Sequence, residues 1–211
     1  LLEGAQGAML DIDFGTYPFL TSSNTTAGGL CTGTGLPPGT LREVHGVLKA
    51  FTTRVGAGPF PTEQTDETGE HLRGTGANQW DEFGTTTGRP RRCGWLDLVV
   101  GRYAVRVNGV AHVHVTKLDV LSQFDTLQIC TAYRLDGKRL ESFPADLCDV
   151  ERCEPEYETL PGWKTDLGGC TSLQSLPQAA QDYLRCVGET LGARIASVSF
   201  GPERRQTLLF D

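Results

Sequence analysis

The 211-residue sequence has neither an excess of positive charge nor a long apolar segment. No uninterrupted apolar run approaches the roughly 20 residues that a transmembrane helix needs, and no charged start precedes the apolar core of a signal peptide. A formal net charge of -7 gives the chain no general attraction to nucleic acid or to an anionic membrane. These absences predict a soluble protein that binds neither a membrane nor nucleic acid.

Cysteine pairs with metal-ligand spacing are also missing. The seven cysteines are scattered, and no two of them form a Cys-x-x-Cys motif. We therefore predict reduced, mostly buried thiols in a cytoplasmic protein, with a disulfide or zinc framework as the less favoured alternative. His112 and His114 alternate along one segment without a third ligand nearby, which argues against a metal site there.

The phosphate-binding motif Gly-x4-Gly-Lys-Ser/Thr is absent, because the Gly-Lys pair at Gly137 is followed by Arg139. What the chain does have is a globular, loop-rich composition, with 38% hydrophobic residues, 26 glycines and 11 prolines. Its first residue is Leu1, and Leu-Leu-Glu-Gly is typical of a strand that enters a glycine turn. We therefore expect the sequence to be a fragment that begins inside a fold.

Hydrophobic periodicity predicts alternating strands and helices in the first part of the chain. Helical spacing marks residues 41–50 and 95–107, whereas residues 51–55 and 110–119 have the pattern of strands. Residues 63–83 are polar, rich in glycine and low in apolar content. We expect that stretch to be a mobile excursion.

The second part of the chain continues the alternation. Two short strands flank the Asp136-Gly137 turn within residues 127–140, which predicts an antiparallel hairpin. A helix is predicted over residues 176–191, with proline in its first turn and glycine past its end. Residues 195–199 are predicted to form the last strand.

This alternation is typical of an α/β fold: a mostly parallel, twisted sheet with flanking helices, to which the hairpin adds a small antiparallel piece. We expect one domain over residues 1–211, with a sheet region over 1–126, a hairpin insertion over 127–165 and a terminal helix, strand and loop over 166–211. Ligands of such sheets bind beyond the carboxyl ends of the strands. We therefore expect four loops that follow strands to converge on one rim, near residues 6, 55, 117 and 200.

The segment from Gly84 to Trp95 concentrates hydroxyl groups and arginines between glycines. Arginine binds phosphates and carboxylates with a planar fork of donors, and glycine lets backbone N–H groups approach an oxyanion closely. In an acidic chain, such a local cluster indicates a small anionic ligand. A solvated, flexible surface loop with a chance arginine cluster is the alternative.

Lys117 and Asp119 lie at the carboxyl end of the strand predicted for residues 110–119. A carboxylate in that place can accept two parallel hydrogen bonds from the N1–H and the exocyclic amine of guanine. The aliphatic part of a lysine two positions away can lie along the base. A chance strand terminus with the same residues, Thr-Lys-Leu-Asp, is the alternative.

Several segments together resemble adenylosuccinate synthetase, the family that joins IMP to L-aspartate with GTP. They occur in family order across essentially the whole chain, and several are ten or more residues long: residues 3–29, 53–63, 84–97, 116–119 and 157–163. The resemblance implies a P-loop NTPase-like fold of which this chain is the carboxyl-terminal half.

The resemblance also implies three groups of ligand-binding residues. IMP contacts are expected from Gln6, Thr21, Val55 and Arg89. Aspartate contacts are expected from the loop residues Thr85, Thr86, Thr87, Gly88, Arg89, Pro90 and Arg91. GTP contacts are expected from Arg91, Lys117, Leu118, Asp119, Ser199, Phe200 and Gly201. Phe200 stands where relatives often have a small residue, so its ring either flanks the base or only packs.

The implied chemistry is a two-step ligation in purine biosynthesis. The γ-phosphoryl group of GTP is transferred to the 6-oxygen of IMP, near the Gln6 amide, and the amine of aspartate then displaces phosphate. The implied enzyme is a cytoplasmic homodimer that uses Mg²⁺. Its catalytic residues, phosphate loop and magnesium ligands are expected in an amino-terminal half that this sequence lacks, so the 211 residues alone are predicted to be inactive.

Two other functions stay open. A non-catalytic nucleotide-binding module that lacks the catalytic half would bind IMP or GTP weakly without turnover. A structural or interaction domain that uses only the fold would keep every ligand affinity unchanged in the variants Asp119→Asn and Arg89→Ala.

Overall fold

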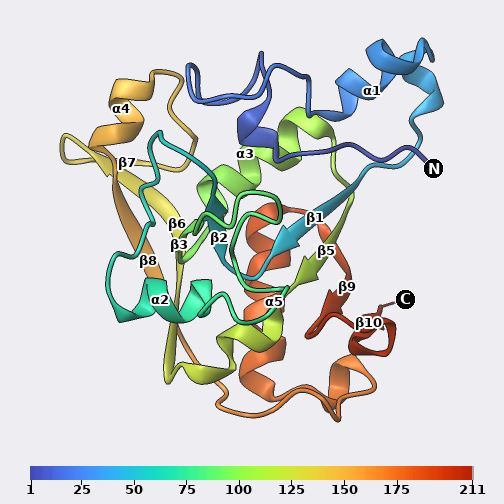
Figure 1. Cartoon of the computed structure of the whole chain (residues 1–211). Coiled ribbons are helices and arrows are strands. Elements are labelled where there is room, and N and C mark those ends of the chain that lie inside the picture. Colours follow the sequence, from blue (N-terminus) through green and yellow to red (C-terminus); the bar gives the residue numbers. More distant parts are fainter. Residues whose placement is uncertain (211) are drawn as a thin grey trace.

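The computed structural model describes residues 1–210, in which one four-stranded sheet is centred on β5 (His112–Thr116). The strand order is β1-β5-β9-β10. β1 (His45–Lys49) and β9 (Arg194–Ser199) run parallel to β5, and β10 (Thr207–Leu209) runs antiparallel to β9. The carboxyl ends of β1, β5 and β9 therefore lie at the same edge of the sheet (Figure 1).

A second sheet is organised around the long strand β6 (Thr126–Leu135). β6 pairs parallel with β4 (Leu96–Asp97) and antiparallel with β7 (Lys138–Leu140) and β8 (Glu154–Pro161). The β6–β7 pair is the predicted hairpin, with Asp136-Gly137 at its turn. The predicted α/β class is confirmed, and the sheets are mixed because antiparallel pairs accompany the parallel ones.

A third, two-stranded sheet joins the segment before residues 56–61, which are rich in glycine and proline, to the segment after the exposed residues 85–90. β2 (Thr52–Arg54) pairs antiparallel with β3 (Arg92–Gly94), with Arg54 opposite Arg92. Short 3-10 helices connect the larger elements, and they cover Ala8–Leu10, Pro38–Thr40, Leu118–Gln123, Leu173–Ser175 and Arg204–Gln206.

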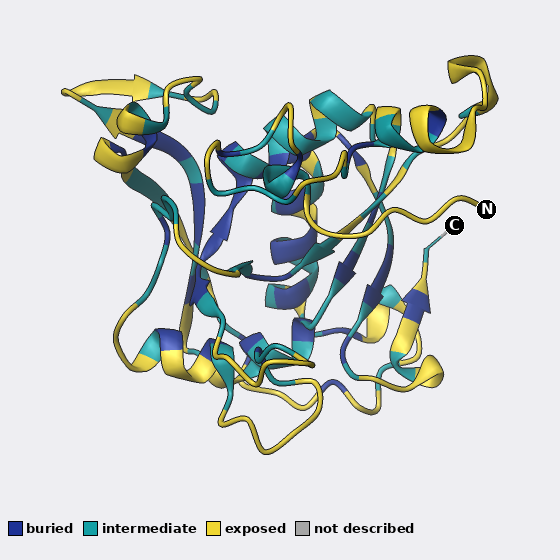
Figure 2. Cartoon of the chain, turned by 45° about the horizontal axis from the view of Figure 1, so that its top comes forward, coloured by how far each residue is buried: buried dark blue, intermediate teal, exposed yellow. Residues whose placement is uncertain are grey.

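The longest helix, α5 (Gln178–Leu191), supplies the centre of the core. Its buried residues recur every three to four positions: Ala180, Tyr183, Leu184, Val187 and Leu191. The helix ends at Gly192 in the left-handed conformation, as the sequence predicted. Figure 2 shows its buried surface between the two larger sheets, where the hydroxyl of Tyr183 donates to the carbonyl of Ala50 at 2.5 Å.

The remaining helices are shorter and lie nearer the surface. α3 (Leu98–Asn108) packs on α5 and β6, and α2 (Glu67–Arg73) packs on β3. α1 (Ala27–Thr34) and α4 (Leu147–Arg152) lie at the periphery of the molecule (Figure 1). α3 begins three residues later than predicted. Residues 96–97 pair with β6 instead, and the Asp97 carboxylate caps the helix by accepting from Val99 and Val100.

The helix predicted for residues 41–50 is wrong, because β1 occupies this segment. The apolar residues that suggested a helix do not share one buried face: Val47 faces outward and is 77% exposed, while Leu48 packs on the core. Pairing with β5, which is distant in sequence, decides the conformation. Gly46 lets Val110 approach closely, since a Cβ atom would lie 3.1 Å from a Val110 methyl group.

The prediction that residues 63–83 form a mobile excursion is also wrong. Asp66 caps α2 by accepting from the backbone of Thr68 and Gly69, and Leu72 is 2% exposed. Glu82, at the end of this stretch, is 0% exposed. The strand at residues 194–199 is not the last one, since β10 follows it and pairs with it.

Candidate functional site

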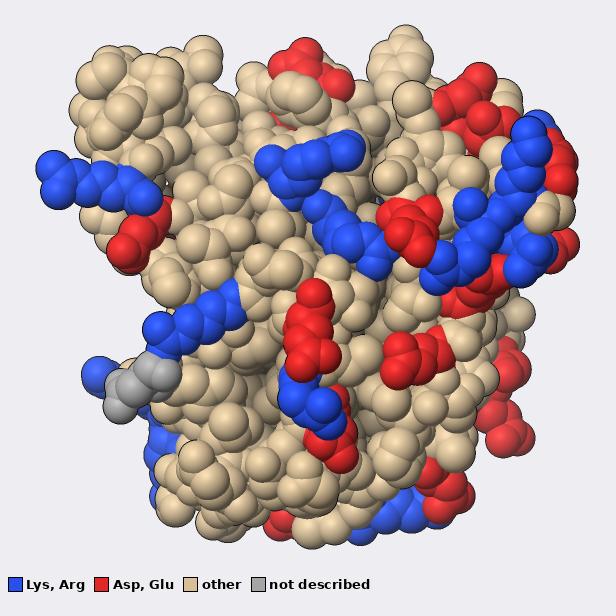
Figure 3. Space-filling model, turned by 180° about the vertical axis from the view of Figure 1, so that it is seen from behind, with Lys and Arg blue, Asp and Glu red and all other residues tan. Residues whose placement is uncertain are grey.

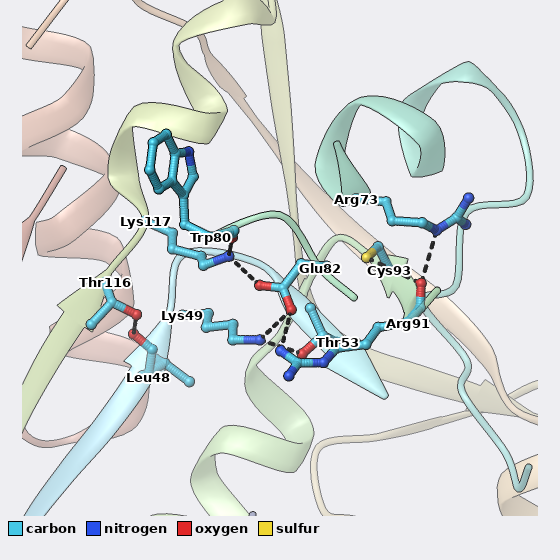
Figure 4. Close-up of polar contacts among 10 residues, drawn as sticks. All are labelled: Leu48, Lys49, Thr53, Arg73, Trp80, Glu82, Arg91, Cys93, Thr116 and Lys117. Atoms are coloured by element: carbon cyan, nitrogen blue, oxygen red, sulfur yellow. Dashed lines mark hydrogen bonds and ion pairs between the residues drawn. The ribbon is translucent and has the colours of Figure 1, made fainter. Parts of the chain in front are cut away.

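A buried carboxylate, Glu82, gathers three basic side chains from distant segments (Figure 4). Its Oε2 atom accepts from Lys49 Nζ at 2.8 Å and from an Arg91 terminal nitrogen at 2.7 Å. Its Oε1 atom lies 2.5 Å from Lys117 Nζ. The side chain of Glu82 is 1% exposed, and those of its three partners are 24–29% exposed. The cluster is therefore closed on the carboxylate side and open on the cationic side.

The parallel strands bring two of the cations together. Lys49 ends β1 and lies opposite Thr116, which ends β5. Lys117 follows directly in the left-handed conformation, with φ 62°, so the chain turns sharply at the sheet edge. The predicted position of Lys117 at a strand end is confirmed.

Backbone hydrogen bonds fix the other two members. The N–H of Glu82 donates to the Arg73 carbonyl at 2.7 Å, and the N–H of Arg91 donates to the Glu82 carbonyl at 2.8 Å. Arg73 Nε donates to the Arg91 carbonyl at 2.9 Å. Glu82 and Arg91 are thus held side by side at the end of α2.

Electrostatics explain why this carboxylate stays ionised. Burial alone would raise the pKa of Glu82, but its interactions with Lys117, Lys49 and Arg91 lower it to about 2. Burial lowers the pKa of Lys49, which its contacts with Glu82 partly oppose. Three cations around one carboxylate leave a net positive charge, and this suits an anionic ligand.

The residues between Glu82 and Arg91 form a compact, exposed turn, which we call the arginine turn (residues 84–90). Gly88 donates to the Gly84 carbonyl at 2.7 Å, and Gly84 donates to the Arg89 carbonyl at 2.9 Å. Residues 85–90 are all exposed, and they include Thr85, Thr86, Thr87, Gly88, Arg89 and Pro90. The structure thus presents hydroxyls and one arginine to solvent on a base anchored at Glu82.

The expected guanine-binding residues come from two adjacent strand ends. Lys117, Leu118 and Asp119 follow β5, while Ser199, Phe200 and Gly201 end or follow β9, its parallel neighbour. Leu118 is 0% exposed and Phe200 is 4% exposed, and both belong to the core. Burial raises the pKa of the half-buried Asp119 carboxyl. The ring of Phe200 therefore packs in the core.

Two of the four expected IMP residues, Gln6 and Val55, line a different hollow, whereas Thr21 and Arg89 do not. Gln6, Val55, Lys49 and Arg91 line one cavity of about 1330 Å³. Thr21 is half-buried, and its N–H donates to the Leu10 carbonyl at 2.9 Å. The cavity gives Gln6 and Val55 a common space with two members of the cationic cluster.

A carboxylate fixes the loop that carries Thr21. Asp11 is 0% exposed and accepts backbone hydrogen bonds from Asp13, Phe14, Thr25 and Thr26 at 2.6–3.0 Å. Burial alone would raise the pKa of Asp11, but these four N–H groups lower it below its usual value. The loop is therefore closed around an ionised side chain.

The prediction that four post-strand loops meet at one rim is right for two of them. The loops near residues 117 and 200 leave neighbouring parallel strands. Residue 55 follows β2 in the separate two-stranded sheet, and residue 6 follows no strand among the described residues 1–210. The cavity, rather than one sheet edge, connects residues 6 and 55 to the basic cluster.

Outside the cluster, charges on the face in Figure 3 are interspersed, with basic and acidic side chains next to one another. Ion pairs at the β6–β7–β8 end link Arg134 and Arg139 to Glu156, and Arg152 to Asp136. No group of three or more His, Cys, Asp or Glu side chains that could hold a metal occurs among residues 1–210. None of the helices described there has the length and apolar character to cross a bilayer.

Four of the seven cysteines are buried, which agrees with the predicted buried thiols: Cys31, Cys93, Cys130 and Cys153. The sequence prediction missed Glu82, Lys49 and Asp11. Lys49 lay in the segment taken for a helix, and Glu82 stood in a stretch without periodicity. The acidic pair Asp11 and Asp13, beside a loop rich in small polar residues, was the one signal that could have indicated a buried loop anchor.

A family profile described as adenylosuccinate synthetase matches residues 1–208. The chain belongs to the adenylosuccinate synthetase family. It is 57% identical over 209 residues to the adenylosuccinate synthetase of Trichlorobacter lovleyi and 54% identical over 211 residues to that of Geobacter sulfurreducens. These alignments cover 99% and 100% of this chain but 48% of each relative. The chain thus spans about half the length of the curated relatives it matches.

A solved structure of the same family agrees with this assignment. The fully ligated adenylosuccinate synthetase from Plasmodium falciparum superposes with a TM-score of 0.93 at 41% identity, over 99% of this chain and 49% of that chain. A cyanophage S-2L succinoaminodeoxyadenylate synthetase bound to dGMP and dATP gives a TM-score of 0.57 at 21% identity, over 98% of this chain and 45% of that chain. The second likeness concerns the fold alone. The adenylosuccinate synthetase fold expected from the sequence is confirmed.

Proposed function

We propose that the protein containing this chain ligates IMP and L-aspartate to adenylosuccinate with GTP, through 6-phosphoryl-IMP. The chain contributes the IMP, aspartate-loop and guanine-reading parts. The observation that carries the proposal is the Glu82 cluster, which holds Arg91 and Lys117 on one buried carboxylate in a chain of the adenylosuccinate synthetase family. A purine nucleoside triphosphate and a dicarboxylate are both anions that suit this cluster.

IMP is proposed to occupy the cavity lined by Gln6 and Val55. The Gln6 amide is near the 6-oxygen, where it can hydrogen-bond the group that becomes phosphorylated. Thr21 donates its hydroxyl to the 5′-phosphate, and the Val55 backbone contacts the ribose. Arg89, which the turn exposes, supplies a cationic contact to IMP.

Aspartate is proposed to bind at the arginine turn and Arg91. The hydroxyls of Thr85, Thr86 and Thr87 are neutral donors on short tethers, while Arg89 and Arg91 bind carboxylates bidentately. Gly88 and Pro90 shape the backbone between them. Because the turn is exposed and Arg91 is anchored, the turn acts as a lid that closes on aspartate and directs its amine to the electrophile.

GTP is proposed to bind through its base beyond β5 and β9. The Asp119 carboxylate accepts from the N1–H and the exocyclic amine of guanine, and the stem of Lys117 lies along the ring. Leu118, Ser199, Phe200 and Gly201 form the walls, with Phe200 as packing behind them. Arg91 faces the phosphates as well as aspartate.

The two steps then follow from positioning and charge. Phosphoryl transfer from GTP to the 6-oxygen needs little covalent help from the protein, so cationic residues and the Gln6 amide contribute mainly by orientation and charge stabilisation. In the second step, the lid brings the aspartate amine to the activated carbon, and phosphate leaves. Exclusion of water by the lid protects the phosphorylated intermediate.

Other parts of the enzyme are proposed to lie outside this chain. The residues described here offer no cluster that fits Mg²⁺, so its ligands are expected in the part of the relatives that the chain does not match. The acid–base residues and the phosphate loop are expected there too, in a cytoplasmic homodimer. We expect residues 1–211 alone to turn over no IMP, GTP and aspartate, and a measurable rate above background would contradict this.

The guanine assignment is tested by Asp119→Asn in the natural polypeptide that contains this chain. In Asp119→Asn the remaining carbonyl oxygen still accepts from one guanine donor, whereas the NH₂ group faces the other. We therefore expect GTP affinity to fall by roughly 100-fold, as the loss of one hydrogen bond to a charged group and the weakening of the other imply. Xanthosine triphosphate, with a carbonyl in place of the amine, should gain affinity. Asp125→Asn is the control, because the Asp125 side chain is 81% exposed beside Lys164. Equal GTP affinity in both variants would refute the assignment.

A further inference from the structure

One carboxylate contacts residues of two proposed subsites at once. Glu82 forms an ion pair through Oε2 with Arg91, which belongs to the proposed aspartate and phosphate subsite. It forms a second ion pair through Oε1 with Lys117, which belongs to the proposed guanine subsite. We propose that Glu82 is a positioning residue that holds these two side chains in binding geometry together. The inference rests on the proposed function, and it assigns Glu82 a role in guanine nucleotide and aspartate binding but not in IMP binding.

Burial makes Glu82 a fixed partner rather than a surface charge. At 1% side-chain exposure, the carboxylate takes its compensation from Lys49, Arg91 and Lys117 instead of bulk water. Removing its charge would leave three cations close together without a counterion, so they would move apart into the open side of the cluster. The binding geometry of Lys117 and Arg91 would then be lost.

Lys117 is oriented by a single short segment of chain. Besides the ion pair with Glu82, its Nζ atom donates to the carbonyl of Trp80 at 2.6 Å. Both partners come from residues 80–82, immediately before the arginine turn (Figure 4). The position of Lys117 therefore depends on the segment that leads into the arginine turn.

Arg91 is held at the other end of the same turn. Its backbone N–H donates to the Glu82 carbonyl at 2.8 Å, and its guanidinium donates to the Glu82 carboxylate at 2.7 Å. Main chain and side chain of Glu82 thus both fix Arg91, while the side chain also fixes Lys117. Glu82 therefore links the proposed aspartate and phosphate subsite to the proposed guanine subsite.

The competing explanation is a buried ion-pair cluster that only stabilises the fold. Such a role predicts a lower melting temperature and a uniform weakening of all ligands. The positioning role predicts a selective effect, because the proposed IMP contacts Gln6, Thr21, Val55 and Arg89 make no hydrogen bond or ion pair with Glu82 among residues 1–210. Binding of IMP is therefore an internal control.

The test uses Glu82→Gln in the natural polypeptide that contains this chain, with Kd values for GDP and IMP from calorimetry and KM for aspartate from steady-state kinetics. We expect the GDP Kd and the aspartate KM each to rise at least roughly tenfold, because each ligand would lose one charge-assisted contact to a displaced side chain. The IMP Kd should stay within about twofold of wild type. Glu156→Gln is the matched control, since Glu156 also pairs with two arginines but lies on β8. It should leave all three values unchanged.

A double variant identifies the route. If Glu82 acts on GDP through Lys117, then Glu82→Gln should weaken GDP binding less in a Lys117→Met background than in wild type. Should Glu82→Gln not be recovered folded, Glu82→Asp keeps the charge and shortens its reach, and the same selective loss is expected from it.

The outcomes separate the two claims. A wild-type protein that binds neither GDP nor IMP refutes the proposed function itself. A wild-type protein that binds both, with a Glu82 variant whose GDP and aspartate constants match wild type, overturns the positioning role. Equal weakening of GDP, aspartate and IMP also overturns it, because that pattern is the signature of a purely structural cluster.

Discussion

The Asp11 carboxylate allows a quantitative prediction about the loop proposed to hold the IMP phosphate. One oxygen accepts from Asp13 and Phe14 at 2.9 and 3.0 Å, and the other accepts from Thr25 and Thr26 at 2.6 and 3.0 Å. In Asp11→Asn, an amide NH₂ replaces one oxygen and faces two N–H donors. Losing two hydrogen bonds to a charged acceptor should lower the free energy of unfolding by roughly 3–5 kcal/mol.

The assay is urea unfolding of the natural polypeptide that contains this chain, together with its IMP affinity. Asp13→Asn is the control for unfolding, because Asp13 is exposed and accepts from the Asn24 side chain at 2.6 Å. We expect it to cost about 1 kcal/mol or less. IMP binding should weaken in Asp11→Asn, since Thr21 lies within the clamped loop. If Asp11→Asn costs no more than Asp13→Asn, the reasoning about the clamp is wrong.

Three further predictions concern charge and packing. The folded-state pKa of Glu82, about 2, is below the unfolded value of 4.5, so ionisation of Glu82 stabilises the fold above pH 4.5 by about 3 kcal/mol. In denaturation curves, the difference in free energy of unfolding between wild type and Glu82→Gln should shrink as the pH falls from 4.5 toward 2. Gly162→Ala should lower the melting temperature by several degrees because its Cβ would overlap a backbone carbonyl, whereas Gly28→Ala, in open space, should not. Tyr133→Phe removes a buried 2.5 Å hydrogen bond to Asp97, whose pKa is raised to about 6 mainly by burial, and should cost about 2 kcal/mol in urea unfolding at pH 7.

Local chemistry made several elements predictable from the sequence. Proline at its start, glycine at its end and a regular apolar face indicate the helix at residues 178–191. The turn residues Asp136-Gly137 indicate the hairpin. All of these signals lie within a few residues of the element they define. The strand at residues 45–49 has no such signal, because its partner β5 lies some seventy residues away in sequence.

Site residues, too, were predictable only where the signal was local in sequence. Lys117 and Asp119 were predictable because a strand and its end residues are adjacent in sequence. The Glu82 cluster was not, since it combines four separate segments and a lone glutamate in a polar, Gly-rich stretch has no periodicity. Phe200 was ambiguous from sequence, and its 4% exposure is decided by packing that no local pattern contains.

The strand order β1-β5-β9 also has a temporal consequence during synthesis. Ribosomes release the chain from its amino end, so Lys49 and Lys117 emerge long before β9, which completes the parallel sheet with residues 194–199. Contacts between such distant segments form slowly, because loop closure must precede them. Until residue 201 has left the ribosome, the nascent chain lacks Ser199, Phe200 and Gly201, which are proposed to form one wall of the base pocket.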